Sequence, residues 1–204
     1  MLENIKQLST IEPKFQNIID EFGLPEIKTR PQGFVALVQL ILEQQVSIAS
    51  AEACFRKIES KIQKVEPLPL LSLSDEELKA CGVSRQKINY LKNLAEQIIL
   101  QTFDPLNLEQ LSEKEAFQEL VQLKGIGKWT AEVYLMFCLQ KKNIFPIGDI
   151  AIQRAMTDIF DCKTTDEMLL KANQWEPYRT LASYLLWHYY LGKKNRLYSF
   201  LVKN

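Results

Sequence analysis

Apolar residues recur every three or four positions along most of this chain, which is the spacing of a helix with one buried face. The first 30 residues show this spacing in one or two short segments, broken by Pro13, Gly23 and Pro25. No long run alternates apolar and polar residues between hairpin turns. The sequence therefore predicts an all-α fold, with further helices over residues 34–42, 85–99, 113–123, 129–139, 150–160 and 164–171.

Several of these segments begin with residues that favour a helix start. Ser74 with Glu77 three positions later predicts a capping box. Thr165 is a candidate cap, and Pro177 suits the first turn of the last helix. Lys87, near the start of another helix, is expected to be either a phosphate contact or a solvated charge.

The composition limits the size of the core and the kind of partner. With 204 residues, 47% of them apolar, the chain can form one sizeable core or two small lobes that share a cleft. Lys plus Arg and Asp plus Glu both number 25, so the formal net charge is zero. A protein that coats nucleic acid through bulk charge would be basic. Any contact with DNA must therefore be local.

The four cysteines are scattered, without the paired spacing of a zinc or iron–sulfur site. We expect them to be reduced thiols, as in most intracellular proteins. The N-terminus lacks the basic start and apolar core of a signal peptide. No apolar stretch approaches a membrane-spanning length of about 18 residues. These features predict a cytoplasmic protein, or a nuclear one in a eukaryote, with no membrane partner.

The most informative stretch joins two helical segments through Gly125-Ile126-Gly127. Glycines at this spacing allow a sharp turn with positive φ, and Ile126 between them can pack between the two helices. Backbone amides at the start of the second helix then form an anion site that suits a phosphate. Lys124 and Lys128 flank this site. The alternative is a helix C-cap and tight turn without a ligand.

A second feature follows where Pro146 and Gly148 interrupt the helical pattern. Asp149 comes next, at the N-cap position of a helix that begins with Ile150. A carboxylate there accepts backbone N–H bonds and faces the positive end of the helix dipole. The plain interpretation is a helix cap, but a capping carboxylate can also take part in catalysis.

The motif L-K-G-I-G-K-W-T-A, followed by P-I-G-D with Asp149 twenty-two residues after Gly127, resembles the helix-hairpin-helix (HhH-GPD) DNA glycosylase superfamily. Within it, the chain is most similar to the 3-methyladenine DNA glycosylase II family. Segments such as Q-L-I-L-E-Q-Q-V-S-I-A-S-A and W-x-P-Y-R-x-x-A-x-x-x-x-W extend the resemblance over roughly residues 33–190. It implies two helical lobes, 33–125 and 1–32 plus 126–204, with the active site in the cleft between them. It also implies a monomer that binds double-stranded DNA.

The resemblance assigns DNA-binding roles to single residues. Gln45 would wedge into the base stack where a nucleotide is flipped, although a surface glutamine at a helix turn is the alternative. The DNA backbone would be held at the hairpin by Gly125, Gly127, Lys124, Lys128 and Thr130. No sequence-specific contact is implied.

The resemblance also identifies a base pocket. Trp187 matches the aromatic residue that lines this pocket, with pure core packing as the alternative. Tyr184 and Trp129 are weaker candidates for the same pocket. His188 is the only histidine in the chain and is expected to be structural, since no second histidine is present to share a metal.

The chemistry of base removal accounts for the small number of acid–base candidates. Cleavage of an N-glycosidic bond develops positive charge on the sugar, and Asp149 would stabilise this charge or orient the attacking water. A base alkylated on a ring nitrogen is already cationic and leaves without an acid. The predicted function is a hydrolase of base excision repair, a DNA glycosylase that removes alkylated bases such as 3-methyladenine after flipping them.

Strand-cutting members of the superfamily carry a lysine, which forms a Schiff base, two residues after the second hairpin glycine. Here that position is Trp129, and Lys128 lies one residue early. We therefore expect a monofunctional glycosylase without lyase activity. By the same resemblance, the backbone carbonyl groups of Val121, Leu123 and Ile126 would hold a structural Na or Mg ion. The chemistry requires no cofactor.

Three alternatives stay open. The chain could be a glycosylase for oxidised or deaminated bases, or a non-catalytic module that binds DNA damage through its hairpin. It could also be a purely structural helical protein, in which hairpin and aspartate coincide by chance. Asp149 at the expected place favours an enzyme, because a protein that only binds DNA has no need of this carboxylate.

Overall fold

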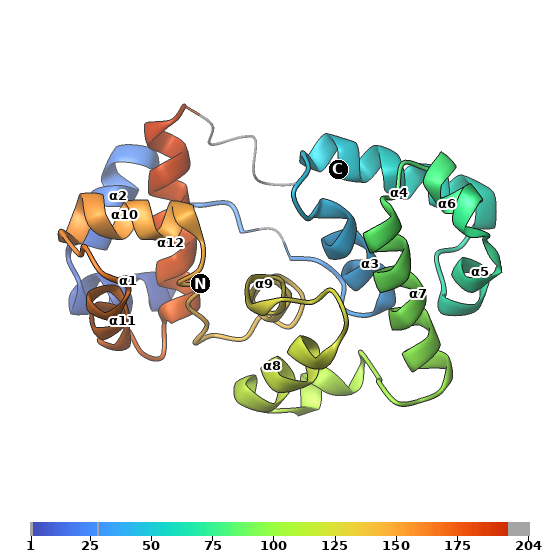
Figure 1. The fold of residues 1–204 in the computed structure, drawn as a ribbon. Coiled ribbons are helices and arrows are strands. Elements are labelled where there is room, and N and C mark those ends of the chain that lie inside the picture. Colours follow the sequence, from blue (N-terminus) through green and yellow to red (C-terminus); the bar gives the residue numbers. More distant parts are fainter. Residues whose placement is uncertain (1, 28, 196–204) are drawn as a thin grey trace. The chain divides into compact units, whose positions relative to one another are not determined.

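The computed structural model describes residues 2–27 and 29–195 (Figure 1). Over these residues the chain forms twelve α-helices and one 3-10 helix, and no strand. The predicted all-α fold is confirmed. The chain divides into two compact units: Arg30–Tyr134, named here the hairpin unit, and Met1–Thr29 with Leu135–Asn204, named here the terminal unit.

The division falls inside a helix rather than at the glycine turn. Helix α9 (Lys128–Phe137) contains the junction, because Tyr134 ends the hairpin unit and Leu135 resumes the terminal unit. The sequence placed the boundary between 125 and 126, so residues 126–134 lie on the other side of the junction in the structure. Both arms of the hairpin thus belong to one compact unit.

The hairpin unit is built around α3 (Phe34–Glu43), which is apolar almost throughout. Seven of its ten residues are buried. Helices α4 and α7 pack against it, while α5 and α6 pack against α7 (Figure 1). The elements around α3 are α4 (Ile48–Ile62), α5 (Pro67–Ser72), α6 (Asp75–Ala80), α7 (Arg85–Ile99), η1 (Asn107–Gln110) and α8 (Glu113–Gln122).

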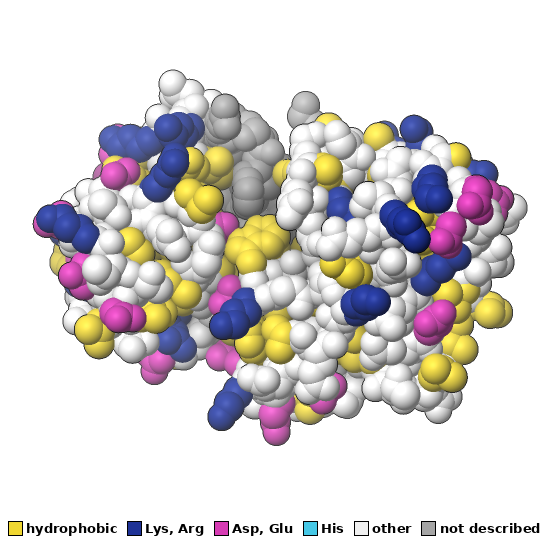
Figure 2. All heavy atoms as spheres, in the orientation of Figure 1, with side chains coloured by type: hydrophobic (Ala, Val, Ile, Leu, Met, Phe, Trp, Pro, Cys, Tyr) yellow, Lys and Arg dark blue, Asp and Glu magenta, His cyan; other side chains and the backbone are white. Residues whose placement is uncertain are grey.

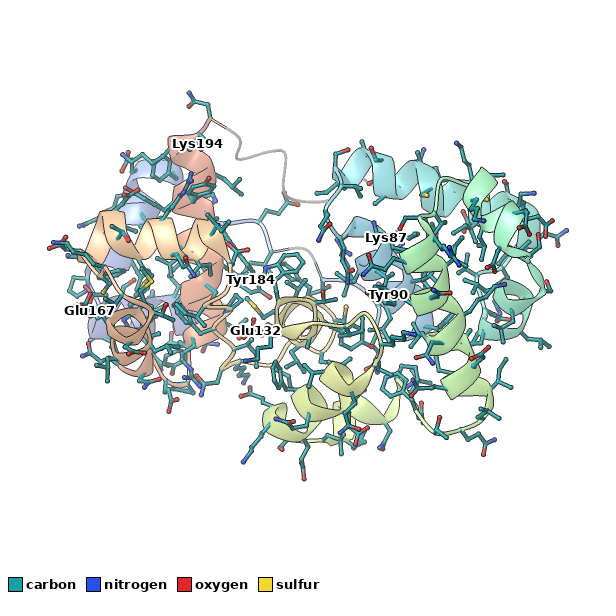
Figure 3. All side chains as sticks on the ribbon, viewed as in Figure 1. Lys87, Tyr90, Glu132, Glu167, Tyr184 and Lys194 are labelled. Carbon is teal, nitrogen blue, oxygen red and sulfur yellow. The ribbon has the colours of Figure 1, made fainter. Side chains whose placement is uncertain are left out.

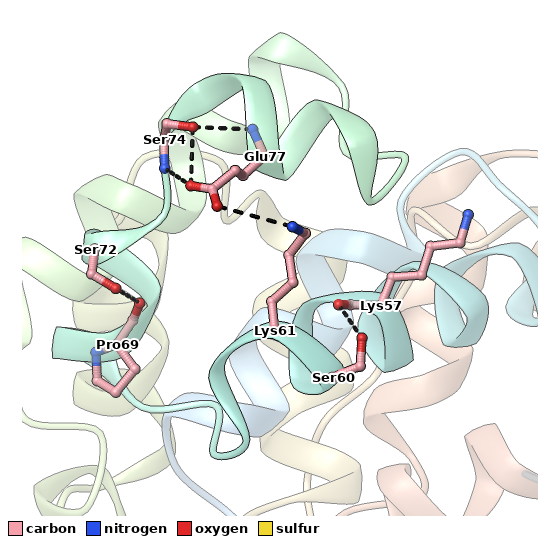
Figure 4. A network of polar contacts seen from close by, with 7 residues as sticks. All are labelled: Lys57, Ser60, Lys61, Pro69, Ser72, Ser74 and Glu77. Carbon is pink, nitrogen blue, oxygen red and sulfur yellow. Dashed lines mark hydrogen bonds and ion pairs between the residues drawn. The ribbon is translucent and has the colours of Figure 1, made fainter.

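The predicted capping box at the start of α6 is confirmed. Glu77 accepts a hydrogen bond from the Ser74 backbone amide at 2.8 Å, and its own amide donates to the Ser74 hydroxyl (Figure 4). These hydrogen bonds hold the pKa of Glu77 below its ordinary value. Lys61 Nζ lies 3.9 Å from the same carboxylate, which links α4 to α6. Ser112 and Glu115 form a second capping box at the start of α8.

The terminal unit has an aromatic core centred on the fully buried Trp175. Its ring lies 4.9 Å from that of Phe15, 5.2 Å from Phe160 and 6.0 Å from Phe145, measured between centroids. Because these rings come from segments far apart in sequence, they join the N-terminal helices to the C-terminal part of the unit. The helices are α1 (Leu2–Ile11), α2 (Lys14–Phe22), α10 (Ile150–Phe160), α11 (Thr165–Asn173) and α12 (Arg179–Lys193).

Helix α12 packs against both α2 and α10 (Figure 1). Gly192 allows close contact with α2, since a Cβ atom there would lie 2.4 Å from the Phe22 ring. His188 Nε2 lies 3.1 Å from the carbonyl oxygens of Phe22 and Gly23, at the C-terminal end of α2. The single histidine therefore has the structural position expected from the sequence.

Two predicted helix starts are wrong. Pro177 precedes α12, which begins at Arg179. The Thr180 backbone amide, in the first turn of α12, donates to the Lys142 carbonyl. Thr164, rather than Thr165, caps α11 through its hydroxyl, which accepts the Glu167 amide.

Basic and acidic side chains are interspersed on the face of each unit that Figure 2 shows. This distribution agrees with the formal net charge of zero. Among the described residues, none of the helices combines the length and apolar character that a membrane span requires.

Candidate nucleic-acid interface and catalytic carboxylate

The hairpin forms as the glycine pattern predicts, with one correction. Helix α8 ends before Leu123, and the Ile126 amide donates to the Leu123 carbonyl at 3.0 Å. The Gly127 carbonyl accepts the Ala131 amide, which starts α9. Ile126 is buried, and its packing between the two helices stays a prediction. Of the two glycines, only Gly125 has a positive φ, at 91°.

The two glycines have different roles. A Cβ atom on Gly125 would lie 2.3 Å from ring atoms of Tyr90, on α7, so this position has no room for a side chain. At Gly127, a Cβ would meet no described atom within 4 Å other than those of its chain neighbours. The Gly127 backbone is therefore open on the outside, at the N-terminal end of α9, where an anion can reach the amides.

A groove of about 870 Å³ passes beside this turn within the hairpin unit. One wall is the hairpin itself, from Val121 to Gly127, with Trp129 and Thr130. The other walls are the loop after α3 and the start of α7, which contribute Gln45 and Tyr90. Lys124 and Lys128 are exposed beside the turn. The hairpin and the proposed wedge residue thus share one surface.

Gln45 lies at the tip of the loop between α3 and α4. It is exposed, with φ of 56°, and the next residue, Val46, is 47% exposed. Ser47 then caps α4 by accepting the Ser50 amide. An exposed tip between two capped helices can insert into a base stack, so the wedge role of Gln45 stays a prediction.

The neighbouring Gln44 was not singled out from the sequence. Its side-chain amide donates to the Gly125 carbonyl at 2.8 Å and to the Thr130 hydroxyl at 3.3 Å. Thr130 was expected to contact DNA, but its side chain is buried. The Thr130 hydroxyl thus has a partner inside the hairpin unit, and a contact between Thr130 and DNA stays a prediction.

Lys87 is not a freely solvated charge, while a contact between Lys87 and phosphate stays a prediction. From α7 its Nζ points to the end of α3 and donates to the carbonyl oxygens of Leu42 and Gln44, at 2.7 and 2.8 Å (Figure 3). Burial lowers the pKa of Lys87 from its ordinary value. The lysine thus caps the C-terminal end of α3, where carbonyl groups need donors.

In the terminal unit, Asp149 caps α10 as predicted. Its Oδ1 accepts the amides of Ala151 and Ile152 at 2.8 and 3.1 Å. The preceding loop is tied down as well, because Gln153 Nε2 donates to the Ile147 carbonyl at 2.8 Å. The carboxylate is half-buried, while the adjoining Ile150 is 64% exposed. A fixed carboxylate at a helix N-terminus can stabilise developing positive charge or orient a water molecule.

The aromatic candidates are distributed over both units. Trp187 is buried and stacks on Phe137, with 5.9 Å between ring centroids and 23° between planes. Tyr184 lies 5.2 Å from the same ring, and its hydroxyl donates to the Met136 carbonyl. Burial raises the pKa of Tyr184, so its hydroxyl stays protonated. Trp129, 36% exposed, belongs to the hairpin unit and lines its groove.

The family model described as the HhH-GPD superfamily base excision DNA repair protein matches residues 38–179, which include both the hairpin and Asp149. The chain belongs to the HhH-GPD superfamily.

Relatives place this HhH-GPD protein among the 3-methyladenine DNA glycosylases. It is 30% identical to DNA-3-methyladenine glycosylase 1 of Schizosaccharomyces pombe over 165 residues, which cover 78% of this chain and 72% of the relative. The crystal structure of a DNA-3-methyladenine glycosidase from Bacillus halodurans superimposes with a TM-score of 0.84 at 29% identity, over 97% of this chain and 95% of the other. A 3-methyladenine DNA glycosylase from S. pombe, solved with abasic DNA, gives 0.79 at 26% identity, over 96% and 98%.

The match to the superfamily covers both features that the sequence analysis singled out, the hairpin and Asp149. The hairpin and its groove lie in the hairpin unit, and the capping Asp149 lies in the terminal unit. Gln44 could have been found only as one of a glutamine pair at the end of a helix, a signal too common to be specific.

Proposed function

We propose that this protein is a monofunctional DNA glycosylase of base excision repair, which hydrolyses the N-glycosidic bond of alkylated bases such as 3-methyladenine in duplex DNA. One observation carries the proposal. Asp149 is held by two backbone amides at the start of α10, in a chain whose relatives are named 3-methyladenine DNA glycosylases.

Asp149 supplies the charge that the reaction needs. As the base departs, the sugar becomes cationic, much as in glycoside hydrolysis. A carboxylate already positioned by the Ala151 and Ile152 amides does not have to reorient when this charge develops. It stabilises the sugar or directs a water molecule to its anomeric carbon. No second acid is needed for a base that leaves from a cationic state.

An aromatic pocket selects such a base. A cationic ring gains about 0.5–2 kcal/mol from the face of an electron-rich aromatic side chain. Trp187 and Tyr184 are the proposed pocket residues of the terminal unit, and Phe137 supports the Trp187 ring from behind by stacking. Trp129 is a pocket candidate from the hairpin unit.

The hairpin unit would grip the DNA. Amides around Gly127, at the start of α9, are directed to a phosphate, with Lys124 and Lys128 adding positive charge. Gln45 would fill the space that a flipped nucleotide leaves. Because the contacts are to the backbone, affinity should fall with increasing salt and depend little on sequence. The proposed complex is one protein monomer on double-stranded DNA, in the cytoplasm or, in a eukaryote, the nucleus.

The absence of lyase activity rests on Trp129. This residue occupies the position where strand-cutting members carry their Schiff-base lysine, and a tryptophan has no amine to attack the sugar. Lys128, one residue earlier, points its charge to solvent at the helix start and is proposed to meet phosphate.

A cation at the hairpin would strengthen the phosphate grip. The proposed ligands are the carbonyl oxygens of Val121, Leu123 and Ile126. Val121 lies in the last turn of α8, where carbonyl groups lack helical partners, and the Leu123 oxygen keeps a second lone pair beside the Ile126 amide. Neutral oxygens fit Na or Mg rather than a thiophilic metal. The described residues bring no three His, Cys, Asp or Glu side chains together as metal ligands.

The test is release of free base from duplexes that carry an alkylated, an oxidised or a deaminated base, with strand breaks scored before and after alkali. The proposal expects release from the alkylated duplex, and breaks only after alkali. Breaks without alkali, or a covalent adduct trapped by borohydride, would overturn the monofunctional assignment. Release only from the oxidised or deaminated duplex would overturn the substrate class.

A further inference from the structure

We propose that Gln44 is a positioning residue that couples the hairpin to the exposed tip formed by Gln45 and Val46. Binding of a phosphate by the hairpin would then place this tip at the base stack. The inference rests on the proposed function, since it concerns how a damaged base leaves the duplex.

Gln44 connects the tip to both arms of the hairpin. It is the C-cap residue of α3, directly before the tip. Its Nε2 donates to the Gly125 carbonyl in the turn, at 2.8 Å, and to the Thr130 hydroxyl in the first turn of α9, at 3.3 Å. The two hydrogens of one amide group thus bind the two sides of the turn whose amides are proposed to hold phosphate.

The residues before the tip are also fixed. Lys87 donates to the carbonyl oxygens of Leu42 and Gln44. Arg30 Nη1 lies 3.0 and 3.1 Å from the two carboxylate oxygens of Glu43, in an ion pair whose side chains are 19% and 20% exposed. These contacts hold the end of α3 in place within the hairpin unit.

The tip itself has no such packing. Gln45 is exposed with a positive φ, and Val46 is 47% exposed. A fixed stem suits an exposed tip for insertion. Because the stem is already ordered in the folded protein, binding to DNA does not have to order it. Gln44 belongs to this stem and also contacts the hairpin, so it is the proposed link between the tip and the phosphate site within this unit.

This assignment separates two steps of the reaction. Loss of Gln44 should impair extraction of a stacked base and leave cleavage of an already unstacked base nearly unchanged. A residue that only supports the fold would affect both steps equally.

The experiment compares wild type, Gln44→Leu and a matched control, Gln118→Leu, at an exposed glutamine on α8 outside the groove. Single-turnover release of 7-methylguanine is measured from a fully paired duplex and from the same duplex with the lesion in an unpaired bubble. We expect the release rate of Gln44→Leu to fall about tenfold on the paired duplex, a loss of the size expected for one neutral hydrogen bond. In the bubble the rate should fall about twofold or less. Gln118→Leu should match wild type on both. Equal losses of Gln44→Leu on both substrates, or no loss, would overturn the proposal.

A second readout does not depend on chemistry. The fluorescence of 2-aminopurine placed opposite an abasic site should rise if the tip enters the duplex and unstacks this base. The increase that wild type produces should be reduced in Gln44→Leu at saturating protein, and unchanged in Gln118→Leu. If wild type releases no base but the fluorescence difference holds, the proposed function fails while the coupling stands; an undiminished signal in Gln44→Leu would refute the coupling alone.

Discussion

The ring of Tyr90 occupies the space in which Gly125 would carry a side chain, with ring atoms 2.3 Å from the Cβ position. The same glycine has a φ of 91°. Alanine at this position would meet both a backbone penalty and a clash with a ring that packs from α7. We predict that Gly125→Ala lowers the free energy of unfolding by about 3 kcal/mol or more. Urea unfolding measures this loss, and a change below about 1 kcal/mol would show that the hairpin adapts.

The second glycine provides the matched comparison. Gly127 has no positive φ and faces open space, so Gly127→Ala should keep the free energy of unfolding within about 0.5 kcal/mol of wild type. The added methyl group would lie where a phosphate approaches the α9 amides. We predict about tenfold weaker binding to duplex DNA with an abasic-site analogue, measured by fluorescence anisotropy at fixed salt. Unchanged affinity would remove the hairpin amides from the DNA interface.

Three capping carboxylates predict how stability depends on pH. Hydrogen bonds from helix starts hold the pKa values of Glu77, Glu115 and Glu167 below their ordinary value. The folded state therefore gives up these protons more readily than the unfolded state. The stabilisation is present above the unfolded pKa of about 4.3 and is lost as pH falls through the folded values.

A triple variant, Glu77→Gln, Glu115→Gln and Glu167→Gln, should remove part of this dependence. Glutamine also suits the third position of a capping box, so the variant should remain folded at neutral pH. Urea unfolding at pH 6.5 and at pH 3.5 should show a smaller difference for the variant than for wild type. An identical difference in both proteins would mean that other groups account for the acid sensitivity.

Trp187 should discriminate between charged and neutral lesions. Trp187→Phe keeps an aromatic ring that can stack on Phe137 but presents a weaker face to a cation. We predict a greater loss of release rate for 7-methylguanine, which is cationic, than for hypoxanthine, which is neutral. Equal losses for the two bases would indicate that Trp187 is only a packing residue, as its burial would also allow.

Local pattern was sufficient for most of the helices and for the hairpin. Apolar residues three or four positions apart predict α3 and α7, and two nearby glycines predict the turn. The capping position of Asp149 is likewise determined by the residues on either side of it. Motifs of this kind are visible in the sequence because the interactions they predict are local.

Contacts between distant segments could not be derived in this way. Gln44 bonds to Gly125, 81 positions away, and Lys87 reaches Leu42, 45 positions away. Both side chains look like surface residues until α3, α7 and the hairpin come together. Pro177 was misleading as well: α12 begins two residues later, at Arg179, and its Thr180 amide donates to the distant Lys142 carbonyl.

The central claim is that Asp149 provides the charge for base release, and Asp149→Asn tests it most directly. Asparagine is as good an N-cap as aspartate, so α10 should keep its start and the variant its fold. The measurement is the single-turnover rate of 7-methylguanine release from duplex DNA, alongside urea unfolding of both proteins. We predict a loss of about 100-fold or more with nearly unchanged stability and DNA affinity. A stable, DNA-binding Asp149→Asn variant that releases the base at the wild-type rate would contradict the account.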